Sequence, residues 1–169
     1  LAPHRVTGIR SRGHGLSYCI DTNVFIDAGE RYYPPDIVPG FWKNLDGLIA
    51  TGRMKAPEML IEELERKGDD WRQWVYERKD TLIVPMDLPQ IEAVKKVVAV
   101  YAAEGIDANR ITGDPFFIAL ALAQDLIVVT NEKPRRGGAK IPKICSALGV
   151  PSIGLLDLMR REGWRLVAT

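Results

Sequence analysis

Short apolar runs that alternate with helical stretches constrain the fold of this chain most. Each run is too short for a helix and ends at polar or turn-forming residues, as buried strands do. The predicted strands cover 16–20, 82–84, 126–129 and 152–155, with a final edge strand at 165–167. The predicted helices begin at Val24 and then cover 41–50, 57–67, 70–79, 88–103, 114–124, 141–148 and 156–162. Strands that alternate with helices pair in parallel, so the pattern predicts an α/β fold whose sheet is covered on both faces.

The length and composition of the chain predict one globular domain. The chain has 169 residues, of which 46% are hydrophobic and 27% are charged, and a chain of this size can bury a core without disulfides. We assign the domain to residues 16–169. Residues 1–15 carry glycine and arginine but no apolar core, so we interpret them as a flexible N-terminal arm or an expression remnant.

Four further features limit the class of protein. No apolar run reaches about 18 residues, so no membrane span is predicted. Cys19 and Cys145 lie in apolar stretches, which favours buried, reduced thiols and a cytoplasmic setting. The two histidines, His4 and His14, form no cluster with cysteine, which argues against a zinc site. The net charge of +1 means that any contact with nucleic acid must come from a local patch.

Two acidic residues follow predicted strands. Asp21 comes directly after the first strand, and Glu132 comes shortly after the strand at 126–129. In open parallel sheets the functional crevice lies beyond the carboxyl ends of the strands, so both positions are candidates for a site. The alternatives are a helix N-cap for Asp21 and a polar loop for Glu132.

Two more candidate acids lie on predicted helices. Glu63 follows Leu60 by three residues and Met59 by four, so it leans toward the apolar stripe of its helix, whereas Glu62 lies on the opposite side. A carboxylate at the edge of a packed face is costly unless it is paired or bound to metal, so we choose Glu63, with Glu62 as the fallback. Asp114 precedes Pro115, and its alternative is an ordinary N-cap.

Four segments of the chain resemble, in order, the motifs of the PIN-domain superfamily. Residues 18–26 resemble its opening strand and Asp-Thr-Asn motif, and residues 60–64 resemble its apolar-x-x-Glu-Leu helix. Residues 114–121 resemble its Asp-x-x-Ile-Ala helix, and residues 128–132 resemble its strand followed by Thr-x-Asp. The resemblance spans about residues 17 to 160, and within the superfamily the chain looks like a VapC-like prokaryotic nuclease. It implies a three-layer α/β/α sandwich with a central parallel sheet.

The resemblance also implies roles for individual residues. Asp21, Glu63, Asp114 and Glu132 would ligate one or two Mg²⁺ or Mn²⁺ ions, which are hard cations that prefer oxygen ligands. Asn23 and Thr130 would orient these acids. The sequence departs from the family pattern at Glu132, where aspartate is usual, and at Pro115, where a small residue is usual.

Basic residues cluster directly after the fourth acid. We predict that they contact the phosphates of the substrate beside the metal site, because acids alone would repel a polyanion; they are Lys133, Arg135, Arg136 and Lys140, with Lys143 close by. The alternative is a solvated loop. The tryptophans, in contrast, are interpreted as packing residues rather than base-stacking ones; they are Trp42, Trp71, Trp74 and Trp164.

The sequence therefore predicts a metal-dependent endoribonuclease, by resemblance the toxin of a toxin–antitoxin pair, with an antitoxin protein and a homodimer as implied partners. RNA is favoured over DNA as substrate only by the resemblance, because no residue of the sequence discriminates the two. The alternatives are a non-catalytic RNA-binding or scaffolding domain and a nuclease that acts on DNA. Dinucleotide binding is disfavoured because no Gly-x-Gly-x-x-Gly follows the first strand.

Overall fold

The computed structural model describes residues 15–67, 71–107, 111–132 and 141–167. Within these ranges, five parallel strands form one sheet in the order β3-β2-β1-β4-β5. The strands are β1 (Tyr18–Ile20), β2 (Met54–Pro57), β3 (Ile83–Val84), β4 (Ile127–Val129) and β5 (Ser152–Ile153). The prediction of a parallel sheet is therefore confirmed.

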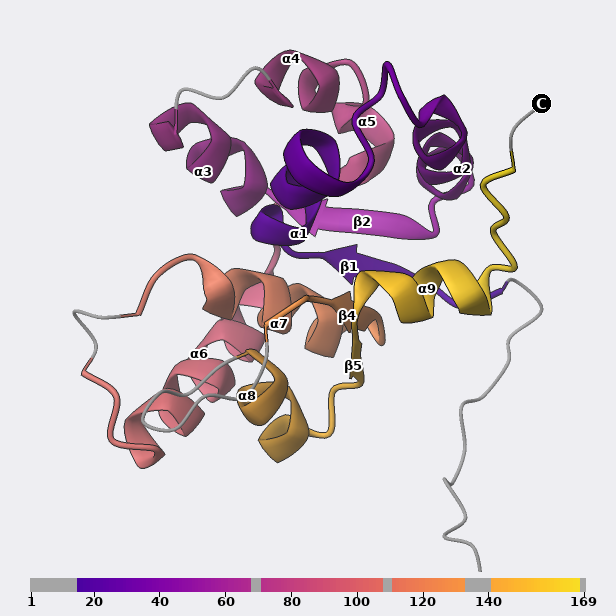
Figure 1. The fold of residues 1–169 in the computed structure, drawn as a ribbon. Helices are drawn as coiled ribbons and strands as arrows, with labels where there is room; N and C mark the ends of the chain where they lie inside the picture. Colours follow the sequence, from indigo (N-terminus) through magenta and orange to yellow (C-terminus); the bar gives the residue numbers. More distant parts are fainter. Residues whose placement is uncertain (1–14, 68–70, 108–110, 133–140, 168–169) are drawn as a thin grey trace, which may run out of the picture.

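Helices cover the sheet from two sides (Figure 1). One side carries α1 (Thr22–Asp27), the π-helix η1 (Ala28–Tyr32), α2 (Pro39–Ala50), α3 (Met59–Lys67), α4 (Trp71–Tyr76) and α5 (Lys79–Leu82). The other side carries α6 (Leu88–Ala103), α7 (Asp114–Gln124) and α8 (Ile141–Leu148). The last helix is α9 (Leu155–Arg161), and Trp164 beyond it packs edge-on against Phe41 of α2. The three-layer α/β/α sandwich is confirmed.

The central strands are apolar throughout because both of their faces are covered. Every residue of β1 and of β4 is buried. Cys19 of β1 aligns with Val128 of β4, and both are fully buried. Continuous burial of this kind is what a parallel sheet between two helical layers demands. Cys145 is also buried, and both cysteines are free thiols, as predicted.

Strand β2 was not predicted from the sequence. Its four residues include Lys55 and Pro57, so it contains no apolar run. The prediction that Pro57 lies in the first turn of a helix is wrong: Pro57 ends β2, in register with Val84 of β3, and α3 begins at Met59. The ammonium of Lys55 donates a hydrogen bond to Gln124 Oε1 of α7 at 3.1 Å, which gives this polar side chain a partner within the sandwich.

The predicted edge strand at 165–167 is also wrong. These residues form neither helix nor strand, and the side chain of Val167 is 74% exposed. The edges of the sheet are β3 and β5, and residues 165–167 pair with neither of them. Within the described ranges, no helix is long and apolar enough to cross a membrane.

Helix α7 is the buried centre of the molecule. It contacts β1, β2 and β4 on one side and packs along α6 on the other. Accordingly it is apolar around most of its circumference, with Phe117 to Ala121 all buried, as expected of a helix enclosed by other elements. This packing fixes the position of the first residue of the helix, Asp114.

An aromatic cluster fixes α1 and η1 against the neighbouring helices. The ring of Trp42 stacks on Trp71 with centroids 4.7 Å apart, and Phe25 of α1 contacts Trp42, Trp71 and Trp74. The tryptophans therefore pack, as the sequence indicated. Because Phe25 lies one helical turn after Asp21, this cluster holds the start of α1 in place.

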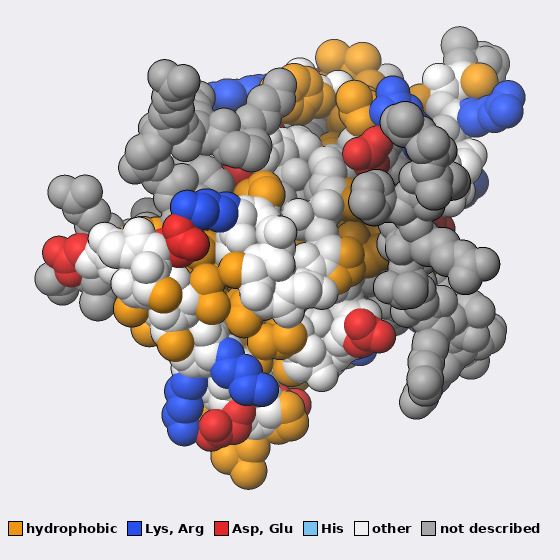
Figure 2. Space-filling model, turned by 90° about the horizontal axis from the view of Figure 1, so that it is seen from below, with side chains coloured by type: hydrophobic (Ala, Val, Ile, Leu, Met, Phe, Trp, Pro, Cys, Tyr) orange, Lys and Arg blue, Asp and Glu red, His pale blue; other side chains and the backbone are white. Residues whose placement is uncertain are grey.

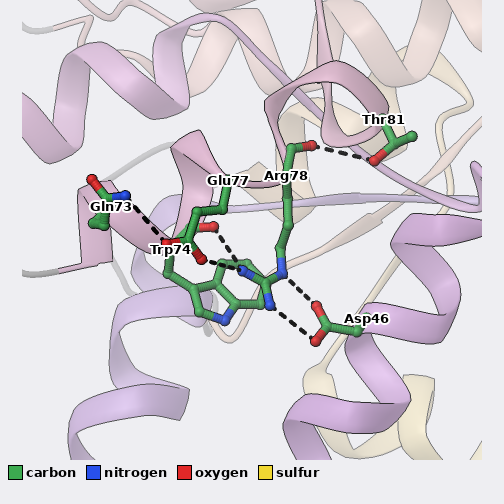
Figure 3. A network of polar contacts seen from close by, with 6 residues as sticks. All are labelled: Asp46, Gln73, Trp74, Glu77, Arg78 and Thr81. Carbon is green, nitrogen blue, oxygen red and sulfur yellow. Dashed lines mark hydrogen bonds and ion pairs between the residues drawn. The ribbon is translucent and has the colours of Figure 1, made fainter.

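A polar network joins α2 to α4 and α5 (Figure 3). The guanidinium of Arg78 donates to both carboxylate oxygens of Asp46, at 2.5 and 3.0 Å, and lies 3.8 Å from the centroid of the Trp74 ring. A planar, two-bond pairing of this kind fixes orientation as well as distance. The network thus ties the aromatic cluster to α2.

Gly29 provides a test of this packing. A Cβ added at Gly29 would lie 2.1 Å from Cζ2 of Trp71, and the stacked indole has no room to withdraw. We expect Gly29→Ala to lower the free energy of unfolding by about 2 kcal/mol, as overpacking does. Gly47→Ala is the control, because a Cβ there meets nothing within 4 Å and alanine favours the helix. Urea denaturation should show the first variant destabilised and the second not, and equal midpoints would contradict the assignment.

Candidate metal centre

Asp21 lies at the carboxyl end of β1, between the two central strands. Its backbone N–H donates to the carbonyl of Val129 in β4 at 3.0 Å, and only 2% of the residue is exposed. Asp21 is also the N-cap of α1, where its Oδ1 accepts a long hydrogen bond of 3.4 Å from the backbone N–H of Asn23. The capping alternative is therefore confirmed. However, capping a helix does not require that the carboxylate be buried, so it does not account for the burial of Asp21.

Thr130 connects Asp21 to Glu132. The Thr130 hydroxyl donates to Asp21 Oδ2 at 3.3 Å and accepts from the backbone N–H of Glu132 at 3.2 Å. The carboxylate of Glu132 in turn accepts from the backbone N–H of Ile141 at 3.0 Å, at the start of α8. The acids after β1 and β4 are thus held in one chain of hydrogen bonds.

Glu63 lies between the starts of α1 and α7. Its Oε2 accepts a hydrogen bond from the Thr22 hydroxyl, and its Oε1 would lie 2.1 Å from a Cβ on Gly113. Thr22 is the residue after Asp21 and Gly113 is the residue before Asp114, so the Glu63 carboxylate lies at the starts of the two helices that carry these acids. Glu62, the fallback, is exposed and pairs with Arg66 one helical turn away. The structure thus distinguishes the two glutamates as the apolar spacing did.

Asp114 is the first residue of α7 rather than its cap. The capping position is occupied by Gly113, whose backbone is helical and which makes no side-chain capping bond, and Pro115 follows within the first turn. The N-cap alternative for Asp114 is therefore wrong.

The four acids act on one another electrostatically. Burial, and after it the charges of Asp114, Glu132 and Glu63, together raise the pKa of Asp21 to about 7 against the opposing hydrogen bond from the backbone of Asn23. Acids far apart in the sequence therefore lie within electrostatic range of Asp21 at one end of the sheet. Among the described residues, however, no three acid, histidine or cysteine side chains already form a ready chelating group. A cation would have to draw together carboxylates that repel one another.

The remaining predicted residues divide into two groups. Thr130 orients Asp21 through its hydroxyl, whereas Asn23 does so only through its backbone N–H, because its side-chain oxygen accepts from Lys67 Nζ at 2.9 Å. The predicted phosphate contacts Lys133, Arg135, Arg136 and Lys140 lie outside the described residues. Lys143, which is described, forms an ion pair with Glu104 of α6.

The described part of the α6 and α8 face carries no single basic surface. Figure 2 shows Lys and Arg side chains scattered among acidic and apolar ones on this face. This arrangement fits the near-neutral net charge. The ammonium of Lys67 donates a hydrogen bond to the side chain of Asn23, two residues after Asp21.

Sequence reasoning missed two residues near the site. Gly113 has no side chain, which lets Glu63 approach the start of α7. Tyr101 of α6 is buried, and the charges of Asp114 and Glu132 contribute to raising the pKa of its hydroxyl. Apolar periodicity along the helix at 88–103 detects the ring of Tyr101 but not the direction of its hydroxyl.

Comparison with known proteins places the chain in a family. Residues 18–166 match a model described as a domain of unknown function, DUF4411. The chain belongs to the DUF4411 family. No curated protein matches this DUF4411 chain.

Solved structures show which fold the DUF4411 chain has. It is similar to DNA-bound VapBC from Salmonella typhimurium, with 18% identity, a TM-score of 0.56, and coverage of 83% of this chain and 98% of the other. It is also similar to VapBC2 from Rickettsia felis bound to a promoter DNA fragment, with 14% identity, a TM-score of 0.55, and coverage of 82% and 98%. A third similar structure is VapBC-1 from nontypeable Haemophilus influenzae, with 12% identity, a TM-score of 0.55, and coverage of 82% of this chain and 98% of the other. The fold is PIN-like, of the VapC type.

The burial of Asp21 predicts an unusual dependence of stability on pH. The folded protein holds the Asp21 proton more tightly than the unfolded chain, so without metal its stability falls as the pH rises from about 4 to about 7. We expect Asp21→Asn to keep the cap and to raise the metal-free free energy of unfolding at pH 7.5 by about 2 kcal/mol.

The control is Asp87→Asn at the exposed N-cap of α6, where the carboxylate accepts from Gln90 N at 2.9 Å. Asparagine caps about as well as aspartate, so we expect little change there. Thermal denaturation in EDTA at pH 4.5 and 7.5 measures both variants. A destabilised Asp21→Asn protein at pH 7.5 would contradict the predicted electrostatic cost.

Proposed function

We propose that this protein is a metal-dependent endoribonuclease. The observation that carries the proposal is the buried carboxylate of Asp21, which lies at the carboxyl end of a parallel sheet and is acted on by three further acids. These acids come from α3, α7 and the segment after β4. A buried charge surrounded by like charges is costly, and a divalent cation would remove that cost.

The residues fit a hard divalent cation such as Mg²⁺ or Mn²⁺. Asp21, Glu63, Asp114 and Glu132 offer only oxygen ligands, and such ions prefer oxygen. When bound, the cation lowers the pKa of a coordinated water and offsets the negative charge that develops on the phosphodiester. Hydrolysis by in-line attack then breaks the P–O3′ bond and leaves a 5′-phosphate and a protonated 3′-hydroxyl.

Other residues of the chain position these acids. Thr22 holds Glu63, Thr130 holds Asp21, and the first N–H of α8 holds Glu132. Lys67 lies beside Asn23 at the exposed rim, where its ammonium is available to a phosphate of the substrate backbone. The contacts to Glu63, Asp21 and Glu132 set the orientation of these three carboxylates before any ligand arrives.

Partners follow from the same resemblance. The solved relatives are VapBC structures, two of them bound to DNA. We propose that this chain is the toxin of a toxin–antitoxin pair, that it binds an antitoxin protein, and that it forms a homodimer. RNA is the proposed substrate.

The test is cleavage of end-labelled RNA and of single-stranded DNA by the purified protein, in EDTA, Mg²⁺ or Mn²⁺. We expect metal-dependent RNA cleavage that falls to background in the double variant Asp21→Asn, Asp114→Asn. Glu62→Gln is the control, because Glu62 is exposed and pairs only with Arg66 among the contacts described. Equal cleavage by wild type and the double variant would exclude the proposed site. Metal-independent RNA binding without cleavage would favour the non-catalytic alternative, and cleavage of DNA alone would change the substrate.

Gly113 allows the geometry to be tested without removing a charge. A Cβ at this position would collide with Glu63 Oε1 and Met59 Cγ, so the carboxylate must move away from α7. We expect Gly113→Ala to weaken Mn²⁺ binding on the order of tenfold, as displaced ligands do. Isothermal titration calorimetry measures the affinity, with Gly47→Ala as the control for a glycine in open space. An unchanged affinity would remove Glu63 from the ligand set.

A further inference from the structure

The hydroxyl of Tyr101 is buried without a hydrogen-bond partner. Tyr101 lies near the end of α6, only 4% exposed. Among the side chains that the structure describes, its hydroxyl is the one buried polar group for which no partner is found. In contrast, the buried Tyr18 donates its hydroxyl to Glu162 Oε1 at 2.6 Å.

An unpartnered hydroxyl is an unfavourable choice for a protein core. Burial without a hydrogen bond costs the full desolvation of the group, whereas phenylalanine fills nearly the same space at no such cost. The ring alone therefore explains the packing of Tyr101 but not its oxygen. A ligand that accepts a hydrogen bond would explain both.

The position of Tyr101 indicates which ligand. Its side chain is on the buried stripe of α6 together with Ala93 and Val97, and α6 packs against α7 and α8. Asp114 begins α7, and Glu132 accepts from the first N–H of α8. Burial raises the pKa of the Tyr101 hydroxyl well above its usual range, and the charges of Asp114 and then Glu132 raise it further. The hydroxyl is therefore protonated at neutral pH and lies within electrostatic range of Asp114 and Glu132.

We propose that the Tyr101 hydroxyl is a positioning donor of the metal centre: it donates its hydrogen bond to a hydration water of a divalent cation held by Asp114 and Glu132. This inference rests on the proposed function, since it requires that the acids bind a cation. Mg²⁺ and Mn²⁺ keep several waters when proteins bind them, and a buried donor beside the carboxylates fixes where one such water lies.

Removing the hydroxyl distinguishes the proposed role from a purely structural one, because the two roles predict different changes in metal-free stability and in cation affinity. If the hydroxyl serves only the fold, its removal destabilises the metal-free protein or leaves the affinity for the cation unchanged. If it serves the bound cation, Tyr101→Phe leaves the metal-free protein as stable as wild type or more stable, and weakens cation binding. Tyr18→Phe is the matched control, because it removes a partnered hydroxyl at the opposite end of β1 from Asp21.

Calorimetric titration with Mn²⁺ and thermal denaturation in EDTA measure the two quantities on the full chain. We expect Tyr101→Phe to weaken Mn²⁺ binding on the order of tenfold, with an unchanged or higher metal-free Tm. Tyr18→Phe should lower the metal-free Tm and bind Mn²⁺ like wild type. In addition, Mg²⁺ should produce a near-ultraviolet tyrosine difference spectrum in wild type that Tyr101→Phe lacks.

Two results would overturn the proposal, and they differ in scope. Equal Mn²⁺ affinity in wild type and Tyr101→Phe, with identical difference spectra, would remove Tyr101 from the site and leave the nuclease proposal standing. Absence of Mn²⁺ binding and of metal-dependent cleavage in wild type would remove both proposals together.

Discussion

A carboxylate buried between the central strands is the constraint on which the rest of the site depends. Asp21 is bonded through its backbone to β4, through its side chain to Thr130, and through its cap to α1. The negative charges of Asp114, Glu132 and Glu63 then oppose its ionisation. A fold does not gain stability from such an arrangement, because buried like charges repel in a medium that screens them poorly. The cation proposed for this site would offset the cost.

The surrounding packing makes that cost tolerable. Asp114 is placed by α7, which is enclosed by the sheet and α6, and the start of α1 is held by the contacts of Phe25 with three tryptophans. These elements cannot relax apart without opening the core, so the acids stay together despite their repulsion. The packing of α7 and of the start of α1 thus offsets the electrostatic repulsion among the acids.

The fold was largely predictable because burial leaves a local pattern. The apolar runs at β1 and β4 indicated central strands, and the continuous apolar sequence of α7 indicated an enclosed helix. Strand β2 was not predicted because Lys55 and Pro57 interrupt its apolar sequence. The partner of the Lys55 ammonium is Gln124, which lies far along the chain. Residues 165–167 have a strand-like sequence, but in the structure they pair with no strand of the sheet.

The sequence by itself determined the α/β class, the acids that end strands, and the choice of Glu63 over Glu62, because each depends on periodicity or on adjacency along the chain. Only the tertiary structure decided that these acids meet, that Gly113 makes room for Glu63, and that the Tyr101 hydroxyl is buried without a partner. Those features depend on distances between segments that pack side by side while lying many residues apart. Local patterns carry no information about such distances, since the direction of a side chain is set by its neighbours in space.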